Sequence, residues 1–126
     1  MERNYESACK TAGQLYGNLL QRESDSDGFE HAVACITDGS ATVRALVRAI
    51  CVSDEFREKH VMNQTSNELA RRLMINMLGD RRPDARRVKL LSLQLLERDW
   101  RQVVAEVIDS ELYTTAYGDD LVPAWS

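Results

Sequence analysis

The chain of 126 residues, with 44% hydrophobic residues, 29% charged residues and a formal net charge of −4, has the composition of one soluble globular domain spanning residues 1–126. Its acidic balance argues against a nucleic-acid-binding protein, which would usually be basic. No apolar run reaches the roughly 18 residues of a membrane span and no leader segment opens the chain, so we expect a cytoplasmic protein without membrane insertion.

The first part of the chain predicts three amphipathic helices. Apolar residues recur at the helical period over residues 3–21, 29–37 and 42–52. Between the first two, residues 23–28 alternate acidic residues before a glycine, as a calcium-binding loop does, but its twelfth position would be Ala34 instead of a bidentate glutamate. An aspartate that caps a helix N-terminus explains the same composition, so we expect no metal here.

Two further helices are predicted over residues 64–79 and 85–97, where the helical period resumes. Thr65 and Glu68 have the spacing of a capping box, in which each side chain bonds the other residue's backbone amide. Asp84 stands directly before the second of these helices and is suited to cap it. Only 2 prolines and 6 glycines interrupt the chain, which favours helices over a many-turned β fold.

The end of the chain predicts a helix, a kink, a short helix and an extended tail. Valines and an isoleucine within residues 103–108 form one apolar stripe, and Ser110 is placed to cap a second helical run. Gly118 stands where a helix often ends in a left-handed conformation, and Pro123 prevents a restart. The tail then carries Trp125.

An internal repeat relates the middle of the chain to its end. A shift of 57 positions superposes Arg44 on Arg101, Val47 on Val104, Ser53 on Ser110 and Phe56 on Tyr113. Two such units are too few for a solenoid, so we expect them to pack face to face around one core. The predicted fold is an all-α compact bundle of about seven or eight short helices in two related helix-loop-helix halves.

The sequence carries no recognisable catalytic or cofactor motif. The two histidines, His31 and His60, belong to no nucleophile–base pattern. The three cysteines, Cys9, Cys35 and Cys51, are widely spaced without a C-x-x-C pair, and we expect buried, reduced thiols. We therefore predict that the protein is not an enzyme and uses no cofactor or metal.

Three stretches resemble the phycobilisome linker domain. Residues 40–61 are similar to a segment in which a Val-Arg-x-x-Val-Arg helix precedes a serine and an aromatic residue, here Arg44, Arg48, Ser53 and Phe56. Residues 69–84 resemble a Leu-Gly-Arg segment with a proline loop, with Asp80 in place of the usual arginine. The closing signature of that domain is matched by Asp109, Ser110, Tyr113, Tyr117, Gly118, Asp119, Asp120, Val122 and Pro123.

The resemblance implies a helical domain that inserts into the central hole of ring-shaped phycobiliprotein assemblies and carries no bilin. The expected function is thus a non-catalytic structural linker that binds allophycocyanin or phycocyanin and organises the rings for light-harvesting energy transfer, at the cytoplasmic face of thylakoids. Members of the family are generally basic, whereas this chain is acidic. The alternative is a regulatory or adaptor module of the same fold, with another protein partner or with self-association as a homo-oligomer.

Two arginines are the first candidate partner-binding residues. Arg44 and Arg48 lie four residues apart on one predicted helix face, and arginine suits contacts with acidic groups of a partner. The competing interpretation is solvation, or internal pairing with the nearby Asp54 and Glu55.

The tail supplies the other candidates, Asp119, Asp120, Pro123 and Trp125. A tryptophan that follows a proline near the end of the sequence either folds back on the domain or is exposed as a large apolar anchor for a partner. Both alternatives remain open from the sequence.

Overall fold

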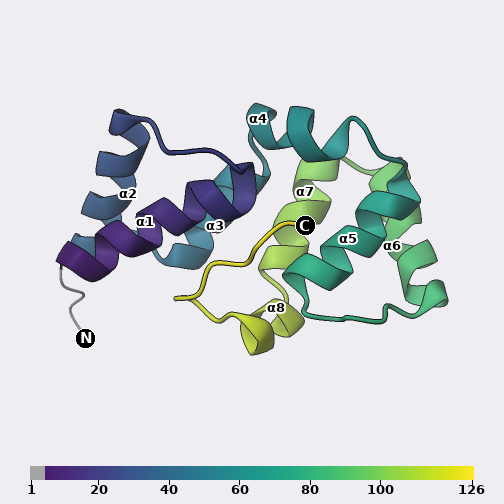
Figure 1. Cartoon of the computed structure of the whole chain (residues 1–126). Helices are drawn as coiled ribbons and strands as arrows, with labels where there is room; N and C mark the ends of the chain where they lie inside the picture. Colours follow the sequence, from purple (N-terminus) through teal and green to yellow (C-terminus); the bar gives the residue numbers. More distant parts are fainter. Residues whose placement is uncertain (1–4) are drawn as a thin grey trace.

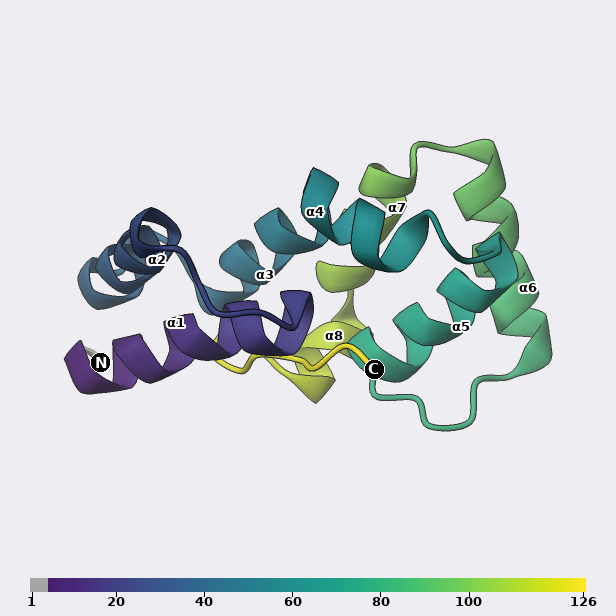
Figure 2. The same cartoon turned by 45° about the horizontal axis from the view of Figure 1, so that its top comes forward.

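The computed structural model describes residues 5–126, and these form helices with no strand among them. The elements are α1 (Tyr5–Leu20), α2 (Ser26–Asp38), α3 (Val43–Cys51), α4 (Asp54–Phe56), the π-helical turn η1 (Arg57–Val61), α5 (Ser66–Met77), α6 (Ala85–Glu97), α7 (Trp100–Ile108) and α8 (Glu111–Ala116). The prediction of an all-α bundle of short helices is confirmed. Figures 1 and 2 show α2 and α6 at opposite ends, with α3 and α7 between them.

Local capping explains most of the helix boundaries. At most helix starts, a side-chain oxygen accepts a hydrogen bond from a first-turn amide that has no partner within the helix. These capping residues are Asp25, Thr42, Ser53, Thr65, Asp84, Asp99 and Ser110. Because Asp25 caps it, α2 begins three residues earlier than the apolar pattern predicts. Gly118 ends the last helix with φ of 64°, the left-handed conformation that glycine adopts without strain.

The predicted repeat appears as two matching bends, α3–α4 and α7–α8. In each, the serine hydroxyl donates to the carbonyl three residues earlier, at 2.6 Å for both Ser53 and Ser110. The same hydroxyls accept from the amides of Phe56 at 3.2 Å and Tyr113 at 3.3 Å. Both aromatic side chains are fully buried. The serine thus fixes a bend that turns the following aromatic residue into the core.

One main core joins the helices, with contributions from α1, α3, α5 and α7. Val104 is fully buried and Val107 nearly so, as the apolar stripe predicts. A smaller cluster of Ala70, Met74 and Val88 fills the contact of α5 with α6. No helix of residues 5–126 has the length and apolar character needed to cross a lipid bilayer.

The C-terminal tail lies between α1 and α5 in both views (Figures 1 and 2). The backbone amide of Trp125 donates to the carbonyl of Asn18 in α1 at 3.0 Å. The carbonyl of Ser126 accepts from Arg72 at 2.6 Å and from Asn76 at 3.3 Å, both in α5. The tail therefore connects the first helix with the fifth.

The Val104→Asp variant should lose most of its stability. An unpaired carboxylate would replace a methyl-lined contact in the core, at a cost on the order of several kcal/mol. Urea unfolding followed by far-ultraviolet circular dichroism measures the loss. Gln102→Asp, at an exposed position of the same helix, is the control and should change stability by less than about 0.5 kcal/mol. Equal midpoints for the two variants would contradict the core assigned to α7.

Candidate protein-interaction surfaces

Arg44 and Arg48 lie at the contact between the two halves of the fold. Arg44 is the second residue of α3, and its guanidinium donates to the Thr114 hydroxyl at 2.6 Å and pairs with Asp119 at 3.2 Å. It also lies 5.2 Å from the centre of the Tyr113 ring. Arg48, one turn later, pairs with Asp109 at 2.6 Å. Both arginines of α3 thus contact the α7–α8 half.

Arg101, which the repeat relates to Arg44, makes a similar contact from the second half of the fold to the first. Arg101 is the second residue of α7, and it donates to the carbonyl of Val52 at 3.1 Å and pairs with Asp54 at 2.7 Å. Val52 follows the last residue of α3, where helix carbonyls lack partners within the helix. Arg101 therefore lies at the C-terminal end of α3, and Arg44, which also donates to the carbonyl of Gly118 at 3.4 Å, lies at that of α8. A positive charge is favourable at both places.

The structure shows the internal pairing of the two arginines, and their role in binding a partner stays a prediction. Internal pairing is observed, but the predicted partners are wrong. Asp54 is bound by Arg101, and Glu55 is bound by Arg22 from α1 at 2.6 and 2.9 Å. The reason is tertiary: α3 packs against α7, so its arginines reach α7 and α8 instead of the acids that follow them in sequence.

The predicted tail residues divide into exposed and buried ones. Asp119 pairs with Arg44, and Asp120 is exposed. Pro123 is fully buried and Trp125 is only 6% exposed. Of the two alternatives for Trp125, the structure has the one in which it folds back, which leaves neither it nor Pro123 on the surface as an anchor.

Trp125 packs into an aromatic cluster that the sequence did not indicate. Its ring meets Phe56 edge-on at 5.1 Å between centroids and lies 5.4 Å from His60. His60 comes from η1, and its Nε2 donates to the carbonyl of Leu19 at 2.9 Å. Lys59 beside it donates to the carbonyl of Leu20 at 2.6 Å. These two side chains satisfy carbonyls at the end of α1, and a π-helical turn gives no clear periodic signal from which to predict them.

The surface of α6 combines exposed leucines with positive charge. Leu90 is 55% and Leu96 70% exposed, and Leu93 lies between them on the same helix. Residues 80–89 carry five arginines or lysines and only two aspartates, and these basic side chains are exposed. A chain of net charge −4 therefore has a basic end. The signal in the sequence was an excess of leucines in residues 85–97, more than one buried helix face can hold.

A groove runs between α6, α7 and α8 and has a volume of about 290 Å³. Leu90 and Leu112 are exposed at its edges, and Arg87 and Glu106 supply polar groups. Its apolar lining includes Met74, Leu78, Leu90, Leu91, Val107 and Leu112. An accessible apolar surface with a polar rim is typical of protein contacts.

A second groove lies at the opposite end, between α1 and α2, with a volume of about 310 Å³. Tyr5, Phe29, Val33 and Ala34 supply apolar surface, and Glu30 also lines it. Tyr5 is 68% exposed.

The cysteines and acidic residues form no recognisable metal centre in the described chain. No group of three or more His, Cys, Asp or Glu side chains comes together there as a metal site. Cys51 is buried, which raises the pKa of its thiol, whereas Cys9 and Cys35 are half-buried. All three cysteines are free thiols. The prediction that they are buried holds only for Cys51.

Trp125→Ala should destabilise the fold, because it removes a buried ring that packs against Phe56 of α4 and His60 of η1. We expect a loss of about 3–5 kcal/mol, as for other buried tryptophans. Thermal and urea unfolding measure it. Leu121→Ala, at an exposed position of the same tail, should stay within about 0.5 kcal/mol of the parent. A mild Trp125→Ala effect matching that control would show that the tail is not part of the core.

Stability should also fall as the pH drops below about 6.5. Burial lowers the pKa of His60 from its ordinary value of 6.5, and the neighbouring Lys59 and Arg72 lower it further, against the raising effect of its bond to Leu19. Between the two pKa values the unfolded chain binds more protons than the folded one, so acidification favours unfolding. His60→Gln should flatten the slope of unfolding free energy against pH in this window. An unchanged slope would refute the assignment.

The model of the family described as "Phycobilisome Linker polypeptide" matches residues 4–125. The chain is also 26% identical over 110 residues to a phycoerythrin-associated rod linker, the phycobilisome 27.9 kDa linker polypeptide of Microchaete diplosiphon. That alignment covers 87% of this chain and 43% of the relative, so the chain spans less than half of the relative's length. Because the match runs from the start of α1 to the buried Trp125, the chain belongs to the phycobilisome linker polypeptide family.

Proposed function

We propose that this chain is a non-catalytic structural linker that binds phycobiliproteins and organises them for light-harvesting energy transfer. The observation that carries the proposal is the family match over residues 4–125. The relative from Microchaete diplosiphon is named for its association with phycoerythrin in rods. Phycoerythrin therefore joins allophycocyanin and phycocyanin as a candidate partner, and the complex would lie at the cytoplasmic face of thylakoids.

The groove between α6, α7 and α8 is the surface best suited to such a partner. It offers apolar area that is already accessible, so a partner can cover Leu90 and Leu112 without opening the fold. Trp125 and Arg44, by contrast, are engaged within the domain. Replacing either residue would destabilise the domain, so such a variant would not report on a contact with a partner.

Three of the residues first suggested by the sequence are accessible at the surface without lining this groove. Arg48 binds Asp109, the neighbour of Ser110, which lines the groove. Asp119 and Asp120 follow α8 and are exposed. We propose that these charged residues affect the rate at which a partner associates more than the rate at which it dissociates.

A binding titration with purified phycoerythrin, phycocyanin and allophycocyanin tests the proposal. The parent protein should bind at least one of them. Leu112→Asp places a charge in the groove and should weaken that binding by about tenfold or more, as loss of a central apolar contact does. The matched control is Leu121→Asp, an equally drastic change at another exposed leucine, which should stay within about threefold of the parent.

Binding of the parent protein to the phycobiliproteins tests the proposed function, and the Leu112→Asp variant tests the groove. Absence of binding to all three proteins, at about 50 µM and low salt, would overturn the linker proposal and favour an adaptor with another partner. Binding of the parent that Leu112→Asp leaves unchanged would keep the function and reject the groove.

A further inference from the structure

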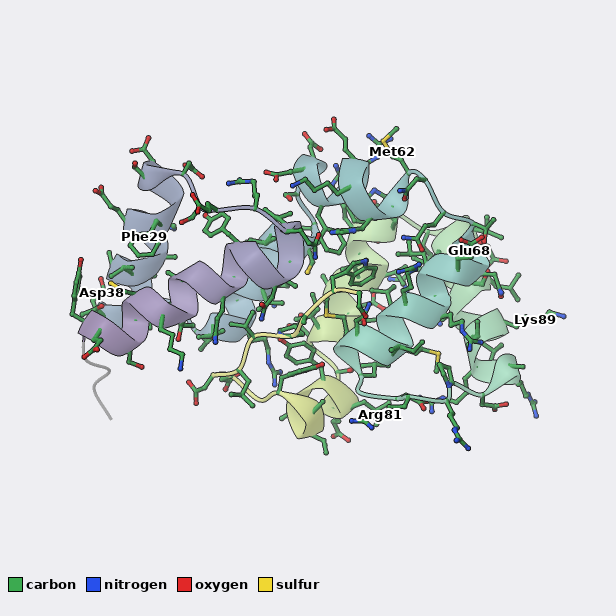
Figure 3. The ribbon with its side chains drawn as sticks, in the orientation of Figure 1. Phe29, Asp38, Met62, Glu68, Arg81 and Lys89 are labelled. Atoms are coloured by element: carbon green, nitrogen blue, oxygen red, sulfur yellow. The ribbon has the colours of Figure 1, made fainter. Side chains whose placement is uncertain are left out.

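The two ends of the molecule carry opposite charge. Residues 23–38, which include α2, have five acidic side chains and neither lysine nor arginine. Residues 80–89, at the start of α6, have five basic side chains against two acidic ones. Figure 3 shows Phe29 and Asp38 at one end and Lys89 at the other, with the Lys89 side chain pointing away from the body and Arg81 on the lower edge between them. The charge of this protein is therefore separated along its length.

Each end also presents apolar surface of a different shape. The acidic end has the groove between α1 and α2, with Tyr5 and Ala34 exposed and Glu30 in its lining. The basic end has a convex ridge on α6, in which Leu93 and Leu96 project into solvent. A helix ridge packs into a groove between side chains, so the two ends are complementary in form as well as in charge.

The ridge is distinct from the groove proposed for phycobiliproteins. At 100° per residue, Arg87, Leu90 and Gln94 lie on the side of α6 that faces the α7–α8 groove. Lys89, Leu93 and Leu96 lie on the other side of the helix's solvent face. The two surfaces can therefore be tested separately.

We infer that two copies of this chain associate head to tail, with the α6 ridge of one copy seated in the α1–α2 groove of the next. Leu93 and Leu96 supply the apolar contact, while Arg86 and Lys89 face the acidic residues around Glu30. Contact of α6 with α6 would instead bring two basic segments together, which is unfavourable. Because each copy keeps one unused end, the contact is heterologous and continues into longer chains of copies.

Sedimentation velocity of the parent gives the first test. From about 10 to about 500 µM at low salt, the average mass should rise through a dimer to larger species. At about 500 mM salt the species should shift towards monomer, since exposed charges are screened. A parent that stays monomeric over this whole range at low salt would overturn the inference.

Two complementary variants give the sharper test. Leu93→Asp with Leu96→Asp disables the ridge, and Glu30→Arg with Ala34→Arg disables the groove. Each variant alone should be monomeric where the parent associates. An equimolar mixture should form a one-to-one dimer that does not grow, because the only intact ridge and the only intact groove then lie on different molecules. Leu121→Asp should associate like the parent.

The mixture separates head-to-tail contact from its alternatives. If both variants are monomeric and their mixture stays monomeric, the inference is wrong. If the groove variant still associates as the parent does, α6 pairs with itself and the inference is equally wrong. Circular dichroism confirms that each variant is folded. Arg86→Glu with Lys89→Glu replaces the ridge variant if the aspartates disturb α6. Phycobiliprotein binding by the parent is measured independently, so either proposal can fail alone.

Discussion

The reciprocal contact of α3 with α7 is the interaction on which the rest of the fold depends. Both helices have only 9 residues, and helices this short are marginal without tertiary contacts. Their apolar faces meet in the core, and Arg44 and Arg101 each cross to the C-terminal end of the other half. Arg44 thereby donates to the Gly118 carbonyl after α8, and Arg101 donates to the Val52 carbonyl after α3. The bends at Ser53 and Ser110 then direct the aromatic residues of α4 and α8 inward.

The tail completes this core, and it explains what the family signature means physically. Ser110 forms the second bend, Gly118 provides the left-handed turn, and Pro123 is buried in the segment that leads Trp125 between α1 and α5. Several of the residues that make the sequence resemble a linker domain therefore build its interior. In these residues the resemblance reports on the fold, and the proposed groove contact uses a surface of α6 that the signature does not describe.

Interactions between residues close together in the sequence could be predicted, and interactions between distant residues could not. Caps such as Thr65 and Ser110 act within three residues, so their spacing alone indicates them. The repeat identified the register of Val104 because both halves follow the same local rules. The partners of Arg44 and Arg48 were missed because they lie about sixty or more residues away and depend on how the halves pack. The same long range hid the place of Trp125, whose neighbours come from α1, α4 and η1.

The net charge of −4 gave little information about the surface, because it averages an acidic end and a basic end. The acidic total differs from the basic charge expected of the family, yet positive charge is concentrated beside the apolar surfaces of α6. One side of this helix faces the groove with Leu112, and the other carries Leu93 and Leu96. A single helix can therefore contribute to two contacts without either covering the other's leucines. For a linker, that geometry would allow a phycobiliprotein and a second copy to be held at the same time.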